Sequence, residues 1–180
     1  GAVKLIQLDV HGDDRGFFIE RYHHEKFLSM GIDSQFVQDN HSRSAPDILR
    51  GLHYQKNPDQ AKLVGCITGK IFDVAVDIRE GSPTFGQWYG AELSSENHKL
   101  LFVPAGFAHG FCVLGSQPAD VLYKCDGVYN RAGDGGIIYN DPDINIDWPV
   151  KEPILSEKDK NQQTLKEYSL NPKFRIDAVK

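Results

Sequence analysis

Short runs in which apolar and polar residues alternate cover most of the chain. The clearest is Lys70–Arg79, and alternation would divide it into two faces, Phe72, Val74, Val76 and Ile78 on one and Ile71, Asp73, Ala75 and Asp77 on the other. A period of two residues is typical of a β-strand. The aspartates on one face fit an ordinary solvent-facing side, the more usual case, or a barrel lumen that binds a polar ligand.

The same pattern predicts further strands along the chain. They are Gly16–Arg21, Phe36–Asp39, Leu49–Gln55, Lys62–Ile67, Gln87–Leu93, Lys99–Val103, Gly110–Leu114 and Val121–Cys125. Thr68-Gly69 suits a tight turn, so Lys62–Ile67 and the strand from Lys70 to Ile78 are expected to pair as a hairpin. Many short strands at this spacing indicate a β-sandwich or barrel.

Helical patterns are scarce and lie near the two ends. One helix is expected over His24–Met30, ended by Gly31, and another over Ser156–Tyr168, with Ser156 as N-cap and Asp159 placed to complete a capping box. No repeat, low-complexity tract or linker divides the chain. We therefore predict a single domain over residues 1–180, with a barrel core of about 16–150 and a C-terminal helical segment of about 151–180.

Charge and composition narrow the classes of function. The 180 residues hold 20 Lys and Arg against 25 Asp and Glu, a net charge of −5. This acidic balance argues against a broad nucleic-acid surface and a basic membrane face, but it allows a small basic pocket. No apolar run approaches a membrane span, and no secretory segment opens the sequence, so a cytoplasmic protein is expected.

Three cysteines, Cys66, Cys112 and Cys125, lie in apolar, strand-like runs. An odd count without close pairing does not indicate a disulfide framework. We interpret them as small buried hydrophobic residues in a reducing compartment.

Two histidines are candidates for chemistry. Arg50 and His53 stand three apart in a predicted strand, on opposite faces unless Gly51 forms a bulge that brings them together. From this run alone, His53 is equally well a half-buried sheet histidine. The Pro-x-Gly-x-x-His spacing of Pro104–His109 recurs in cupin barrels, where the histidine is a metal ligand.

A metal site would need more ligands than the sequence offers. The cupin partner motif has two histidines one residue apart and a following Glu, whereas Leu52–Gln55 holds only His53. Two histidines do not make a three- or four-ligand site. The pattern thus supports the barrel shape and not a metal.

Cations could bind a phosphate or an oxyanion. Arg15, Arg50 and Lys62 have suitable groups, although each alone is more often a solvated surface charge. GxGxxG and GxxxxGK[ST] motifs are absent, so a bound nucleotide would not be held by a Rossmann or P-loop device. Tyr123, taken by itself, fits core packing with its hydroxyl at the rim.

Ordered blocks carry a more specific signal than any of these motifs. They are 14–20 (DRGFFIE), 36–42 (FVQDNHS), 49–55 (LRGLHYQ), 62–64 (KLV), 72–79 (FDVAVDIR), 82–86 (SPTFG), 106–111 (GFAHGF), 123–124 (YK), 140–142 (NDP), 146–149 (IDWP) and 155–159 (LSEKD). Together they resemble the dTDP-4-dehydrorhamnose 3,5-epimerase family, in the right order from Arg15 to Tyr168.

The resemblance implies an all-β, cupin-like jelly-roll barrel with a short N-terminal helix, working as a homodimer without metal or cofactor. It also implies a substrate, a dTDP-linked 4-keto-6-deoxyhexose, and a reaction that inverts C3 and C5 in deoxysugar biosynthesis for surface glycans. Carbons beside a ketone are acidic because the enolate places charge on oxygen. Such an enzyme needs a base, an acid on the opposite face and a cation at the keto oxygen.

The resemblance also assigns residues to these roles. His53 matches the base, Asp159 its supporting carboxylate, Lys62 the cation and Tyr123 the acid. With these roles assigned, two earlier interpretations are less favoured: that Asp159 only caps a helix, and that His109 is a metal ligand. The positions that match substrate contacts are Arg15, Glu20, Gln38, Asn40, Arg50, His109, Tyr129, Asp134 and Lys158.

Two departures leave alternatives open. Val128 replaces one of a pair of aromatics, and Arg131–Gly136 is rich in glycine where the loops border the sugar and base. The alternatives are an epimerase or ketoisomerase acting at a single centre, a non-catalytic sugar-nucleotide-binding domain and a metal-dependent cupin dioxygenase. In every sugar-nucleotide reading, a small basic pocket is expected around Arg15, Arg50, Lys62 and Lys158, completed by a partner subunit.

Overall fold

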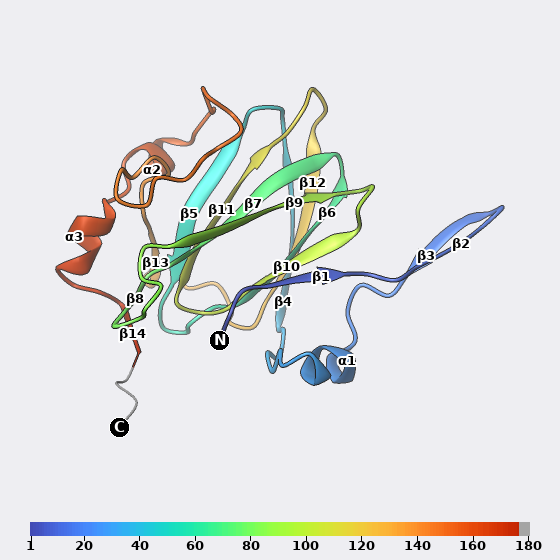
Figure 1. Ribbon diagram of the computed structural model, residues 1–180, viewed down its shortest axis with the longest axis horizontal. Coiled ribbons are helices and arrows are strands. Elements are labelled where there is room, and N and C mark those ends of the chain that lie inside the picture. Colours follow the sequence, from blue (N-terminus) through green and yellow to red (C-terminus); the bar gives the residue numbers. More distant parts are fainter. Residues whose placement is uncertain (177–180) are drawn as a thin grey trace.

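Two five-stranded antiparallel sheets face each other in the computed structural model, which describes residues 1–176 (Figure 1). The first sheet has the order β1 (Lys4–Gln7), β10 (Lys99–Val103), β6 (Lys62–Thr68), β12 (Ala119–Cys125) and β4 (Gln38–Ser44). The second has the order β13 (Asp134–Gly136), β5 (Leu49–Gln55), β11 (Phe107–Val113), β7 (Lys70–Asp77) and β9 (Trp88–Ser94). The predicted all-β barrel is confirmed.

Smaller elements surround this barrel. A projecting hairpin is formed by β2 (Val10–Asp13) and β3 (Gly16–Ile19), and β8 (Arg79–Glu80) pairs in parallel with β14 (Phe174–Arg175). The helices are α1 (His24–Ser29), α2 (Glu157–Lys160) and α3 (Leu165–Ser169). No helix of residues 1–176 is long and apolar enough to cross a membrane.

Both faces of β7 are buried, which decides the place of its aspartates. Val74 and Val76 pack under the C-terminal segment with Tyr168, whereas Ile71 and Ala75 belong to the core between the sheets. Asp73 shares that inner face and has no exposed surface. The solvent-facing interpretation is therefore wrong, because both sides of this central strand are covered.

The predicted hairpin between β6 and β7 is also wrong. The two strands lie in different sheets, β6 between β10 and β12, and β7 between β11 and β9. Gly69, with a φ of 70°, turns the chain where a side chain would lie 2.5 Å from the Pro118 carbonyl oxygen. Because both strands are mostly apolar on both faces, no local pattern selects their neighbours.

The single C-terminal helix expected over Ser156–Tyr168 is two short helices. Ser156 caps α2 as predicted, since its Oγ accepts a hydrogen bond from Asp159 N at 3.1 Å. Thr164 begins α3 with a capping box to Glu167. Between the helices, the Gln163 carbonyl accepts a hydrogen bond from Ile138 N at 2.8 Å, so a tertiary contact replaces continued helix.

The three cysteines are free thiols and all are buried, which confirms their predicted packing role. The N-terminal helix forms as expected, and Phe27 on it packs into a third cluster that covers the outer face of the first sheet. Residues 177–180 of the predicted C-terminal segment lie outside the described residues. The single-domain organisation over 1–180 stays a prediction.

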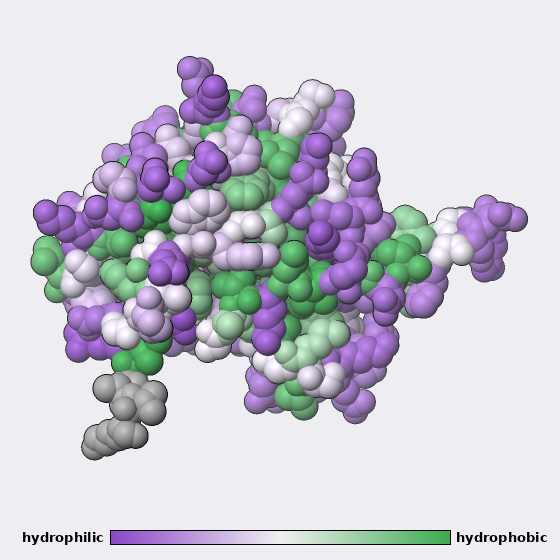
Figure 2. All heavy atoms as spheres, viewed as in Figure 1, coloured by the Kyte–Doolittle hydropathy of each residue, from purple (hydrophilic) through white to green (hydrophobic). Residues whose placement is uncertain are grey.

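The β2–β3 hairpin projects from the barrel (Figure 1). Phe17 and Phe18 on β3 are 66% and 67% exposed, unusual for residues of this size. Figure 2 shows apolar side chains along the base of this projection and hydrophilic ones at its tip. The hairpin thus presents apolar surface that its own chain leaves uncovered.

Candidate active site

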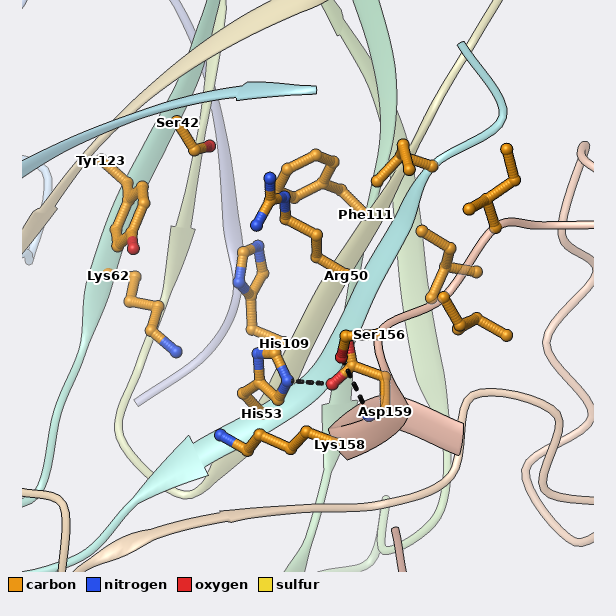
Figure 3. A pocket seen from close by; sticks show the side chains of 14 residues that line it. Ser42, Arg50, His53, Lys62, His109, Phe111, Tyr123, Ser156, Lys158 and Asp159 are labelled. Atoms are coloured by element: carbon orange, nitrogen blue, oxygen red, sulfur yellow. Dashed lines mark hydrogen bonds and ion pairs between the residues drawn. The ribbon is translucent and has the colours of Figure 1, made fainter. Parts of the chain in front are cut away.

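A cavity of about 480 Å³ opens between the two sheets, lined by side chains from both and from the segment around α2 (Figure 3). A second hollow of about 240 Å³ shares His53, Lys62, Tyr123 and Lys158 with it. We treat them as two parts of one site and call them the main cavity and the side hollow.

A bulge in β5 brings Arg50 and His53 to the same cavity, which decides between the two arrangements that the sequence left open. His109 on β11 lies opposite His53, and Phe111 lies opposite Arg50, so three steps along β5 match two along β11. Gly51 makes this possible, with a φ of 129° and space so tight that an added Cβ would lie 2.6 Å from the Gly110 Cα. Only glycine fits both conditions.

His53 is held by Asp159, whose carboxylate reaches it from α2. The distance from His53 Nε2 to Asp159 Oδ1 is 2.6 Å, and Asp159 is 3% exposed. Burial alone would raise the pKa of Asp159, but the hydrogen bond and charge of His53 outweigh it and hold that pKa below its usual range. The other ring nitrogen, Nδ1, has no hydrogen-bond partner among residues 1–176, and His53 lines the cavity, so Nδ1 is available to act as a base.

Lys62 and Tyr123 lie on the first sheet, across the cavity from His53 (Figure 3). Burial lowers the pKa of Lys62, although Cys125, Asp134 and Asp73 oppose that effect. Burial raises the pKa of Tyr123, so its phenol is protonated at neutral pH. The cavity therefore places a lysine and a proton-bearing phenol opposite an oriented imidazole.

A second histidine–carboxylate pair lies beside the first. His109 Nε2 is 2.8 Å from Asp73 Oδ1, and His109 is 8% exposed on the wall of the main cavity. Asp73 was assigned no role by the sequence motifs, although a lumen position was one reading of its strand. Its carboxylate lies on that inner face and holds the ring of His109, a predicted substrate contact.

Arg50 and Lys158 bring positive charge to the main cavity. Arg50 donates from Nε to Ser44 Oγ at 2.9 Å, which fixes its guanidinium on β4. Lys158 forms an ion pair with Asp134 at the border with the side hollow. With Lys62, these two side chains line one cavity, where the sequence leads us to expect a basic pocket.

Four further contacts predicted from the sequence line the side hollow. Gln38 donates from Nε2 to Asn40 Oδ1 at 3.0 Å, and its Oε1 accepts a hydrogen bond from Tyr129 N at 2.8 Å. The Tyr129 hydroxyl is 3.4 Å from Asp134 Oδ2. The structure therefore gathers Gln38, Asn40, Tyr129 and Asp134 into one polar group.

Arg15 and Glu20 lie elsewhere. Arg15 sits at the tip of the projecting hairpin, where its side chain is 90% exposed and paired with Asp13. Glu20 pairs with Lys26 at 2.7 Å. Neither lines the cavity of its own chain, so the basic pocket expected around Arg15 is not formed by one chain alone.

Some lining residues were missed by the sequence motifs, among them Ser42, Gln55 and Gln60. Alternation along β4 could have identified Ser42, which is two residues beyond Asn40 on the same face. Within residues 1–176, no three His, Cys, Asp or Glu side chains are grouped closely enough to hold a metal ion.

Comparisons with known proteins place the chain in a family. The family model described as dTDP-4-dehydrorhamnose 3,5-epimerase matches residues 1–167. An enzyme of that name from Shigella flexneri is 52% identical over 163 residues, 89% of this chain and 90% of the relative. A dTDP-4-dehydrorhamnose 3-epimerase from Streptomyces niveus is 38% identical over 164 residues, 90% of this chain and 79% of the relative.

Solved structures agree with these relatives. The dTDP-6-deoxy-D-glucose-3,5-epimerase of Legionella pneumophila, in complex with dTDP-4-keto-L-rhamnose, superposes with a TM-score of 0.94 and 47% identity. That comparison covers 98% of this chain and 94% of the Legionella chain. Sequence, site geometry and fold agree over nearly the whole chain, which belongs to the dTDP-4-dehydrorhamnose 3,5-epimerase family.

Proposed function

We propose that this chain is an isomerase that inverts C3 and C5 of dTDP-4-dehydro-6-deoxy-D-glucose and yields dTDP-4-dehydro-L-rhamnose. One observation carries the proposal: His53 and Tyr123 lie on opposing sheets of one cavity, with Lys62 also in its wall (Figure 3). Inversion requires that a proton leave one face of a carbon and return to the opposite face. Acid and base on opposing walls meet this requirement.

In the first half of the reaction, His53 Nδ1 removes the proton from C3 or C5. The C–H electron pair becomes the C=C bond of an enolate, and the carbonyl electron pair moves onto O4. The ammonium group of Lys62 stabilises the charge on O4. Asp159, bonded to Nε2, stabilises the imidazolium that forms.

In the second half, the Tyr123 hydroxyl donates its proton to the opposite face of the same carbon. The C–H bond forms from the enolate C=C electrons and the ketone is restored, leaving an imidazolium at His53 and a phenolate at Tyr123. Proton exchange with water returns both groups to their starting states. A second round at the other carbon completes the double inversion.

The substrate itself supplies the electron sink, so the proposed reaction needs no cofactor or metal. Its ketone acidifies C3 and C5, and its diphosphate is an anion that suits the guanidinium of Arg50 and the ammonium of Lys158. His109, Gln38, Asn40, Tyr129 and Asp134 offer further hydrogen-bonding groups around the same space.

We further propose a homodimer in which each hairpin completes the partner's site. The hairpin exposes Phe17 and Phe18, and β4, which carries Gln38 and Asn40, is an edge strand of its sheet. Unpaired edges and exposed aromatics favour pairing with a second copy. Docking beside β4 would bring Arg15 and Glu20 of the partner subunit to the side hollow.

A cytoplasmic location is supported by the three free thiols.

Deuterium incorporation tests the proposed reaction. The 4-keto sugar nucleotide is incubated with the enzyme in deuterated water and both carbons are examined by NMR. We expect deuterium at C3 and C5 of the inverted product, and none with a His53→Ala variant. If the wild-type protein introduces no deuterium at either carbon, the proposal is wrong.

The second candidate is an epimerase that acts at one centre. The Streptomyces niveus relative, named a 3-epimerase, and the replacement of an aromatic by Val128 favour it. Deuterium at only one carbon would select this function. If the His53→Ala variant keeps the function of the wild-type protein, the alternative of a non-catalytic sugar-nucleotide-binding domain is supported. A metal ion bound in stoichiometric amount would support the alternative of a metal-dependent cupin dioxygenase.

A further inference from the structure

One hydroxyl in the wall of the main cavity makes no hydrogen bond within the described part of the chain. Ser42 lines this cavity from β4, and its Oγ atom is buried without a hydrogen-bond partner among residues 1–176. Burial of a hydroxyl that makes no hydrogen bond costs free energy, so such groups are rare in folded proteins and call for an explanation.

The neighbours of Ser42 show that it is the exception on its strand. Gln38, Asn40, Ser42 and Ser44 share the inner face of β4 by alternation. Gln38 and Asn40 are bonded to each other, and Ser44 Oγ accepts from Arg50 Nε at 2.9 Å. Only the Ser42 side chain is left without such a bond among these four described residues.

Arg50 is the cation that shares this part of the cavity. Its Nε and Nη2 donate to the Ser44 hydroxyl and the Arg43 carbonyl, and in the described chain Nη1 donates to no protein group. In Figure 3 the Ser42 hydroxyl points to the side of the cavity on which the Arg50 guanidinium lies. Two donors, one neutral and one charged, are therefore available to one acceptor.

We propose that Ser42 is a further substrate-contacting residue, an assignment that rests on the proposed function. After a turn about its Cα–Cβ bond, the hydroxyl donates a hydrogen bond to an oxygen of the sugar nucleotide that Arg50 also binds. The chemistry is the same whether this oxygen belongs to the diphosphate or to the hexose. Because the hydroxyl does nothing for the folded protein, its contribution is to affinity.

Calorimetric titration of Ser42→Ala with two probes distinguishes the two sources of the oxygen. The probes are dTDP, which lacks the hexose, and dTDP-glucose, which has no ketone and so does not react. We expect the Kd for dTDP-glucose to rise roughly tenfold, as for one lost hydrogen bond to a charged or strongly polar oxygen. An equal rise for dTDP assigns the contact to the diphosphate, and an unchanged Kd for dTDP assigns it to the hexose.

Thermal unfolding of the ligand-free protein separates this role from a structural one. Ser42→Ala removes an unsatisfied buried group, so its Tm should equal or exceed that of the wild type. Ser156→Ala, which removes the cap bond to Asp159 N, should lower the Tm and shows that the measurement responds. Ser95→Ala, which does not line the cavity, is the control for unchanged affinity.

Unchanged Kd values for both probes would overturn the assignment of Ser42, and so would a lowered Tm with unchanged affinity. Neither result would affect the proposed reaction, which fails only if wild-type protein introduces no deuterium. A change in affinity on Ser42→Ala, with no deuterium exchange by the wild type, would leave a sugar-nucleotide-binding protein with Ser42 as a contact.

Discussion

His53 and Asp159 depend on each other for their properties. Asp159 is nearly inaccessible to water, and its carboxylate stays ionised because His53, the Ser156 side chain and the Gly51 backbone N–H hydrogen-bond to it. In return, the carboxylate holds the imidazole ring in one orientation through Nε2. This mutual support distinguishes the pair from a chance surface contact, because a buried carboxylate without partners would be neutral.

Asp159→Asn should lower kcat by about 10² to 10⁴-fold, since the imidazolium loses its counter-charge. Glu157→Gln is the matched control, because this carboxylate on the same helix is exposed and faces Lys160 rather than His53. Product formation measured for both variants tests the dyad. Retention of wild-type kcat in Asp159→Asn would exclude Asp159 from the mechanism.

Tyr123→Phe should separate proton removal from proton return. With His53 intact, deuterium should still enter the recovered substrate, whereas the inverted product should form at least about 100-fold more slowly. Tyr89→Phe, on the exposed part of β9, is the control. Equal loss of exchange and inversion in deuterated water would contradict the role of Tyr123 as the acid.

At the scale of elements, the bulge in β5 positions two residues of the site. It lets two residues that alternation would separate enter one cavity, and it depends on Gly51. Gly51→Ala should lower the free energy of unfolding by at least about 2 kcal/mol, because the added Cβ strains φ and meets the backbone of β11. Denaturant unfolding measures this loss of stability. Gly12→Ala is the control, because a Cβ added at Gly12 would lie 3.7 Å from its nearest atom, the Gly16 carbonyl oxygen.

Asp77 holds the turn that follows β7. Burial alone would raise the pKa of Asp77, but hydrogen bonds from Arg79, Ser82 and Thr84 outweigh it and hold the pKa at about 2. A depressed carboxyl pKa stabilises the fold above the unfolded value near 4, and the effect disappears as the pH falls through about 2.

Asp77→Asn should therefore cost about 2 kcal/mol at pH 7 and progressively less between pH 4 and pH 2. Denaturant unfolding of both proteins across this range measures the difference. If the difference in free energy of unfolding between the wild type and Asp77→Asn stays constant from pH 7 to pH 2, the Asp77 carboxylate does not have the stabilising role assigned to it.

At the scale of the whole molecule, the net charge of −5 describes the surface, while Arg50, Lys62 and Lys158 gather in one cavity. An anionic substrate can bind a protein of the same sign because the field near it is that of the pocket. In the proposed dimer, Arg15 on the hairpin of one subunit would add a further positive charge to the cavity of the other.

Replacing Phe17 and Phe18 together by Asp should convert the proposed dimer into a monomer of about 20 kDa in sedimentation analysis, with loss of activity. Arg15→Ala should leave the dimer intact and raise the KM for the sugar nucleotide. A wild-type protein that sediments as a monomer, or a double variant that stays dimeric, would contradict the proposed arrangement.

Most strands could be predicted because alternation is local: β5 and β10 have the predicted bounds. The choice of neighbouring strands could not. Strands that are apolar on both faces, such as β6 and β7, have no pattern that favours one partner over another, and the long-range packing of the barrel separates them. The prediction of one continuous C-terminal helix failed for the same reason, because Gln163 is bonded to Ile138, which follows β13.

The amino-acid sequence by itself determined the strand-rich fold, the family and the four candidate catalytic residues, since alternation and ordered motifs are readable without coordinates. Only the tertiary structure decided that Asp73 is buried against His109, that Arg50 and His53 share a cavity and that Arg15 lies outside it. These facts depend on which strands become neighbours, and that choice arises from burial summed over the whole barrel rather than from any single segment.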